Sequence, residues 1–197
     1  MGLISNGTTI FDNGSMASGF GGNLIFISKA TASSSASIEF TSGIDSTYKE
    51  YVFYFVNIHP ATDGTFDFNL STDNGSNYNV TKTSTAFRSI HSESDTTSFG
   101  YRTIVDLAQS TSFQQLHNNV GSDSDQTVVG EMHLFNPSST TFVKHFLARM
   151  QSYSADDYSQ DYFIAGYGNT TSPINAIKFQ MNSGNIDAGQ ILLFGVN

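Results

Sequence analysis

The sequence predicts an all-β protein of one domain, folded as a two-sheet antiparallel β-sandwich with a jelly-roll-like arrangement. Apolar and polar residues alternate along successive segments, with Phe66, Phe68 and Leu70 set against Asp67 and Asn69. This is the period of a strand with one buried face. The connections are rich in Gly, Ser, Thr, Asn and Asp, and no long helical pattern lies between them. About a dozen short strands cannot lie in one flat sheet without curling, so two packed sheets are expected.

The predicted strands share short length, enrichment in β-branched and aromatic residues, and turn residues at their ends. They span residues 23–29, 36–40, 51–58, 65–71, 78–83, 86–91, 101–106, 127–135, 142–152, 162–167, 176–181 and 190–196. Two segments, 51–58 and 191–194, are apolar on both faces, which predicts central strands covered on both sides.

Turn residues support these boundaries. Asp63-Gly64 and Asn74-Gly75 supply the positive φ angles of tight turns, and the three prolines fall between predicted strands. Between residues 104 and 116, apolar side chains recur at roughly helical spacing, so a short helix or turn is expected there.

The chain divides into a predicted N-terminal arm or edge strand, residues 1–22, and a β-sandwich domain, residues 23–197. The arm contains the apolar segment Thr9-Ile10-Phe11, a turn at Asp12-Asn13-Gly14 and a glycine-rich stretch at 18–22. An exposed strand edge with few lysines invites pairing with a neighbouring molecule. We therefore expect a homo-oligomer, assembled through strand edges or through the arm.

Composition excludes several classes of protein. The 197 residues include no Cys, so disulfides and thiolate metal sites are excluded, and stability must come from 17 Phe and 9 Tyr. The net charge is −9 and the eight Lys and Arg are scattered singly, so nucleic acid is not an expected partner. No apolar run reaches the length of a membrane span, and the N-terminus lacks the pattern of a secretory signal. Synthesis in a cytoplasm and no membrane partner are expected.

No motif predicts catalysis, a cofactor or a metal centre. A Gly-x-Ser-x-Gly elbow is absent from the sequence, and the five His, at 59, 91, 117, 133 and 145, lack metal-ligand spacing. Among these five, His133 and His145 lie on neighbouring predicted strands and could meet across a hairpin. The acidic clusters Asp123-Ser124-Asp125 and Asp156-Asp157 with Asp161 are alternatives for calcium, although neither has an EF-hand pattern.

One cluster of tyrosines and carboxylates is the candidate ligand-binding site. Tyrosines beside carboxylates can stack on and hydrogen-bond a sugar, and the alternative interpretation is ordinary packing at one end of the sandwich. The predicted ligand-binding residues are Tyr153, Asp156, Asp157, Tyr158, Asp161 and Tyr162.

Four stretches carry a resemblance to a known family. They are residues 2–12 (GLISNGTTIFD), 57–64 (NIHPATDG), 134–146 (LFNPSSTTFVKHF) and 183–190 (SGNIDAGQ). With these stretches, most of the chain resembles an uncharacterised family of virion structural proteins of marine tailed bacteriophages, notably those infecting cyanobacteria. The resemblance implies a virion component, and it identifies no functional residues.

The expected function is therefore a non-enzymatic structural component of a tailed phage virion, made in the host cytoplasm. It would attach to the capsid or tail, contact other virion proteins and present a surface β-sandwich. The first alternative is a carbohydrate-binding adhesin or receptor-binding module for a host-surface glycan. The second is a polysaccharide-degrading enzyme.

Overall fold

A computed structural model describes residues 3–5, 8–12, 15–16 and 23–197. All regular elements of these ranges are β-strands, which confirms the all-β prediction. They are β1 (Leu3–Ser5), β2 (Thr8–Asp12), β3 (Ser15–Met16), β4 (Leu24–Thr31), β5 (Ile38–Phe40), β6 (Glu50–Pro60), β7 (Gly64–Ser71), β8 (Lys82–Ser92), β9 (Thr97–Tyr101), β10 (Gln114–Val120), β11 (Val128–Phe135), β12 (Lys144–Tyr153), β13 (Tyr158–Gly168), β14 (Ala176–Met181) and β15 (Ile186–Val196). No helix of this part of the chain is long and apolar enough to cross a membrane.

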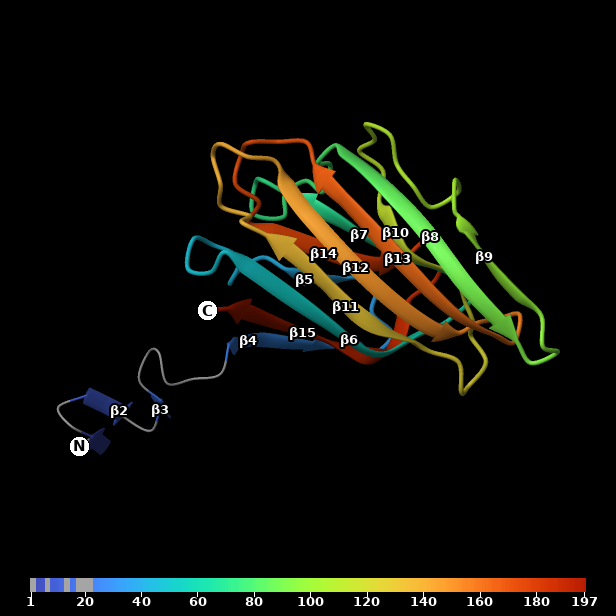
Figure 1. Ribbon diagram of the computed structural model, residues 1–197, viewed down its shortest axis with the longest axis horizontal. Coiled ribbons are helices and arrows are strands. Elements are labelled where there is room, and N and C mark those ends of the chain that lie inside the picture. The colour runs from blue at the N-terminus through green and yellow to red at the C-terminus, as the bar shows by residue number, and fades with distance from the viewer. Residues whose placement is uncertain (1–2, 6–7, 13–14, 17–22) are drawn as a thin grey trace.

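Two antiparallel sheets pack against each other, as predicted. The large sheet has eight strands in the order β4-β15-β6-β11-β12-β13-β8-β9, and the small sheet has four in the order β10-β7-β14-β5. In Figure 1 the large sheet crosses the front of the molecule and the strands of the small sheet lie behind it. The molecule is therefore a β-sandwich with one sheet twice as wide as the other.

The strand order is that of a jelly roll. The first four strands of the large sheet are β4-β15-β6-β11, and the small sheet read from its opposite edge is β5-β14-β7-β10. Strands at the same position in these two series are consecutive in the chain: β4 and β5, β14 and β15, β6 and β7, and β10 and β11. Each of these four pairs is joined by a connection that passes from one sheet to the other, which is the arrangement of a double-sheet jelly roll. Strands β12, β13, β8 and β9 extend the large sheet beyond this eight-stranded core.

Phenylalanines from both sheets form the centre of the core. Phe179 of β14 lies with its ring centroid 5.4 Å from Phe53 and 5.2 Å from Phe55 of the large sheet. It also contacts Phe66 and Phe68 of β7 in its own sheet, at 6.0 and 6.4 Å. All five side chains are almost fully buried. The alternation that predicted the strands therefore also selects the buried face.

Several element boundaries differ from the prediction. The segments 78–83 and 86–91 are not separate strands, because residues 82–92 form the single strand β8. Polar residues do not interrupt it, since the buried hydroxyl of Ser84 donates to Oε1 of Gln114 at 2.6 Å. The strand predicted at 101–106 lies at 97–101 instead.

The short helix or turn expected between residues 104 and 116 is a series of turns that leads into β10. The sequence did not predict β10, because its buried face includes the polar side chains of Gln114 and His117. Gln114 is accommodated there because its Nε2 donates to the carbonyl oxygen of Val105 at 2.9 Å.

Part of the predicted arm forms a small sheet. Strands β1, β2 and β3 pair antiparallel in that order. The predicted turn residues Asn13 and Gly14 and the glycine-rich stretch 18–22 lie outside the described residues. The role of the arm in oligomerisation stays a prediction.

Candidate functional site

The turn between β12 and β13 holds four of the six predicted ligand-binding residues. Tyr153 ends β12, Tyr158 begins β13, and Asp156 and Asp157 lie in the turn between them. The hydroxyl of Tyr153 donates to Oδ1 of Asp157 at 2.9 Å, and this contact raises the pKa of Tyr153 to about 12. Asp156 accepts a hydrogen bond from Nδ2 of Asn119 at 2.7 Å. These side chains are partly or fully exposed, and their binding of a ligand stays a prediction.

The other two predicted residues point to opposite faces of β13. Asp161 accepts from Nη2 of Arg149 at 2.7 Å on the outer side of the large sheet. Tyr162 is fully buried, with its ring 4.7 Å from that of His117. A sugar at the β12–β13 turn therefore cannot contact Tyr162, and the six residues do not form one surface.

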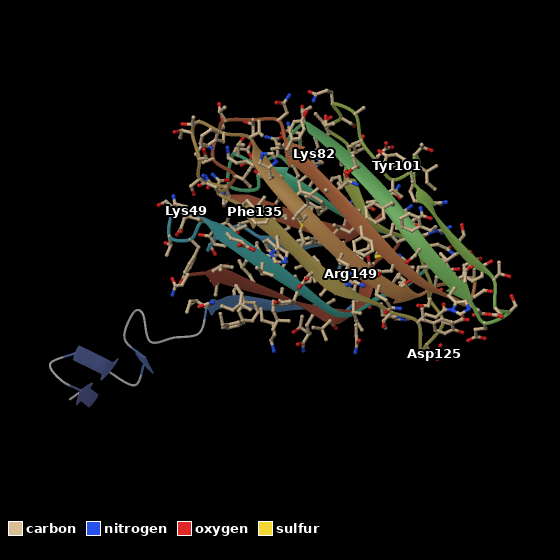
Figure 2. The ribbon with its side chains drawn as sticks, in the orientation of Figure 1. Lys49, Lys82, Tyr101, Asp125, Phe135 and Arg149 are labelled. Atoms are coloured by element: carbon tan, nitrogen blue, oxygen red, sulfur yellow. The ribbon has the colours of Figure 1, made fainter. Side chains whose placement is uncertain are left out.

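Apart from Asp161, the acidic residues considered for calcium lie at the same end of the sandwich as the β12–β13 turn. The connections 61–63, 93–96, 121–127, 154–157 and 182–185 meet there, because β6, β8, β12 and β14 end at this side. With Asp187 they contain eight Asp and Glu and no Lys or Arg. Figure 2 labels Asp125 at this end of the molecule.

The histidines do not come together. His133 of β11 pairs with Leu147 of β12, and its Nδ1 contacts a carboxylate oxygen of Glu50. The ring of His145 packs 6.2 Å from that of Tyr167. Within the described ranges, no group of three or more His, Asp or Glu is placed to hold a metal ion.

The outer face of the large sheet carries the most extensive candidate surface. The outer face is the set of side chains that point away from the small sheet along β4, β15, β6, β11, β12, β13, β8 and β9. Strand register places one residue from each strand in a single cross-strand row. This row contains, in spatial order, Lys29, Leu192, Tyr54, Glu131, Arg149, Phe163, Phe87 and Tyr101.

Three phenylalanines of the outer face form what we call the phenylalanine ladder: Phe163 of β13, Phe87 of β8 and Phe99 of β9. The rings of Phe163 and Phe87 stack with centroids 4.9 Å apart and planes 11° apart. Phe99 meets Phe87 edge-on at 5.6 Å, and the guanidinium of Arg149 lies 4.9 Å above Phe163. Phe163 thus has ring contacts with both Phe87 and Arg149. Phe87 is 39% exposed and Phe99 72% exposed.

A groove of about 340 Å³ runs beside the ladder. Its floor is made by the small side chains of Ala165 and Thr85, which lie in register on β13 and β8. Leu147, which is 49% exposed, forms the opposite wall. Glu131, His133 and Arg149 line one end. Three further hollows lie along the same face, so the outer face is indented over most of its width.

Electrostatics at the groove are mixed in sign. Arg149 forms its ion pair with Asp161, and Nε2 of His133 lies 3.8 Å from Oε1 of Glu131. Figure 2 shows Arg149 near the middle of the front sheet. An apolar groove with a few polar groups at one end is typical of a binding surface.

Sequence reasoning missed the ladder and the groove. Their residues come from strands far apart in the chain: Phe87 and Phe163 are separated by 76 positions, and strand register alone brings them together. One signal was present in the sequence. Tyr162 and Ile164 lie on one face of strand β13, and Phe163 between them lies on the other face, so the strand carries an aromatic ring on each face.

Comparison with protein-family models, with curated proteins and with solved structures finds no match to this chain.

Proposed function

We propose that this protein is a non-enzymatic structural component of a tailed phage virion that docks to neighbouring virion proteins through the outer face of its large sheet. The observation that carries the proposal is the phenylalanine ladder with its groove, on a sheet that no other described strand covers. Contiguous exposed apolar surface on a soluble domain marks an interaction site. The virion assignment is supported by the sequence resemblance and by the jelly roll, an architecture common in viral capsid and lectin domains.

The ladder favours a protein partner over a glycan. Sugars bind aromatic side chains by lying on an open ring face. Here Phe163 stacks on Phe87, and the guanidinium of Arg149 lies 4.9 Å from the centroid of the same ring, so little of this ring is left for a sugar to lie on. Ring edges beside Leu147 offer an apolar surface that suits the aliphatic and aromatic side chains of another protein.

Particle reconstitution tests the proposal. Mass spectrometry of purified particles should detect the polypeptide, and particles lacking it should bind the purified protein. Phe87→Ser should weaken this binding at least about fivefold, since an aromatic anchor at an interface contributes more than about 1 kcal/mol. The matched control is Phe142→Ser, because Phe142 is 66% exposed but lies in the loop before β12, off the outer face. Absence of the polypeptide from particles, or equal binding of Phe87→Ser and wild type, would refute the proposal.

A carbohydrate-binding adhesin is the second candidate, located at the β12–β13 turn. The favouring observation is that Tyr153 and Tyr158 are only partly buried and flank two exposed carboxylates. A glycan array should then give a signal that Tyr158→Ala abolishes. An array without signal from folded protein removes this candidate and leaves the docking proposal unaffected.

A further inference from the structure

The sandwich has four edge strands, and β9 differs from the other three. Natural edges are protected by bulges, lysines or short length. Strand β4 has a bulge and carries Lys29, β10 has two breaks in register, and β5 has three residues. Strand β9 pairs with β8 in an unbroken register, and residues 97–101 include no charged residue and no proline. This edge is the least protected against pairing with another strand.

The hydrogen bonds of β9 show which backbone groups are free. Ser92 N donates to Thr96 O at 2.9 Å, and Arg102 N donates to Ala86 O at 2.9 Å. Hydrogen-bonded pairs alternate along an antiparallel ladder. Even-numbered residues from 96 to 102 therefore face β8, and the N–H and C=O groups of residues 97, 99 and 101 point away from it. No described strand pairs with that side.

We propose that β9 pairs antiparallel with β9 of a second copy of this chain across a twofold axis, with Phe99 opposite Phe99. This register sets Thr97 opposite Tyr101 at both ends, so all three outward-facing residues form hydrogen-bonded pairs. Each pair exchanges two hydrogen bonds, about six in total. A shift by two residues in either direction leaves only two pairs. The large sheets of two copies then join into one continuous sheet, independently of the virion assignment.

Side chains at the same edge support a second copy as the partner. Phe99 is the most exposed large apolar side chain of the described residues, at 72%. Directly opposite residues have Cβ atoms about 5 Å apart, so the two Phe99 rings would meet and join the two phenylalanine ladders. Tyr101 lies on the same edge in Figure 2.

Charges do not oppose this register. Residues 97–101 include no charged residue. Arg102 falls opposite Thr96 of the second copy, and Asp95, whose side chain is 96% exposed, falls opposite Thr103. No like charges meet along the edge.

Cysteine cross-linking of the full chain tests the register. The chain contains no Cys, so Phe99→Cys introduces a single thiol. Opposite hydrogen-bonded residues have Cα atoms about 5.5 Å apart, within the range of a disulfide. Phe99→Cys should give disulfide-linked dimers under mild oxidation. The matched control is Tyr101→Cys on the same strand and face, because the two copies of residue 101 would lie about 14 Å apart. The double variant Thr97→Cys/Tyr101→Cys should cross-link.

Sedimentation of the wild type provides the second measurement. We expect a species of twice the chain mass of 21.4 kDa. Thr97→Pro removes an outward N–H without breaking a bond to β8, so it should keep its circular dichroism spectrum and raise the dimer dissociation constant at least tenfold. A wild type that stays at 21.4 kDa overturns the proposal. So does equal cross-linking of Phe99→Cys and Tyr101→Cys, which would show random collision.

Discussion

Replacing Lys82 by Met should remove most of the pH dependence of stability between pH 7 and pH 9.5. Lys82 is the first residue of β8, and its side chain is fully buried; Figure 2 labels it there. Its Nζ donates to Oδ1 of Asn69 and to the carbonyl oxygen of Val80, at 2.5 and 2.8 Å. No carboxylate is among these partners. Burial therefore lowers the pKa of Lys82 from 10.5 to about 7.

The sign and size of the effect follow from proton linkage. Between pH 7 and 10.5 the unfolded chain holds a proton on Lys82 that the folded chain has mostly released, so stability rises with pH. With these two pKa values the free energy of unfolding should increase by about 3 kcal/mol from pH 7 to pH 9.5. Stopping at pH 9.5 keeps most tyrosines un-ionised, because their ordinary pKa is about 10.

Urea unfolding at pH 7, 8 and 9.5 measures this slope. Lys82→Met should give a nearly flat profile, and at pH 7 it should be more stable than the wild type. The gain will be smaller than the linkage value, because the carbonyl of Val80 loses its ammonium donor, at a cost of about 1–3 kcal/mol. Lys29→Met removes the same charge from an exposed position and should keep the wild-type slope. If the wild type is itself flat over this range, or if both variants keep the slope, the reasoning about Lys82 is wrong.

Three further predictions concern the core, a buried acid and a bulge. Phe179→Ala should lower the free energy of unfolding by about 3–5 kcal/mol in urea, since five phenylalanine rings surround Phe179; a loss below 1 kcal/mol would contradict this core. Burial raises the pKa of Asp67 to about 6, so the folded chain binds the proton more tightly than the unfolded chain. The wild type should therefore gain about 2.5 kcal/mol relative to Asp67→Asn as the pH falls from 6 to 3, and parallel pH profiles would exclude this. Gly189→Ala should cost about 2 kcal/mol, because φ is +117° and a Cβ would lie 2.5 Å from the Asn57 carbonyl oxygen; an unchanged melting temperature would argue against the bulge geometry.

The sequence predicted the fold well where one face of a strand is apolar. The segment 176–181 was predicted with the boundaries that β14 has, because Ile177, Phe179 and Met181 alternate with Lys178 and Gln180. The prediction failed at β10, where buried Gln114 and His117 break the pattern. Such residues are placed by tertiary contacts that no local pattern encodes.

The candidate surface was harder to predict than the fold. The tyrosine cluster was chosen by closeness in sequence, and the structure places Tyr162 on the buried side of the strand that also carries Asp161. The phenylalanine ladder depends on the lateral order β13-β8-β9. Alternation predicts which residues face outward but not which strands lie side by side. The phenylalanine ladder could therefore be recognised only once the order of the strands in the sheet was known.

The position of β15 constrains when the protein can fold during synthesis. Strand β15, Ile186–Val196, follows all other strands of the sandwich in the chain, yet it is inserted between β4 and β6 and hydrogen-bonds to both. Until it emerges, the first strand of the large sheet has no neighbour, and β6 has one open side. Closure over such a long sequence separation is slow, because the entropy of the whole loop is lost before the pairing is gained. The jelly roll is therefore completed only once β15 has left the ribosome, and until then a nascent chain must stay soluble with an unfilled gap in its main sheet.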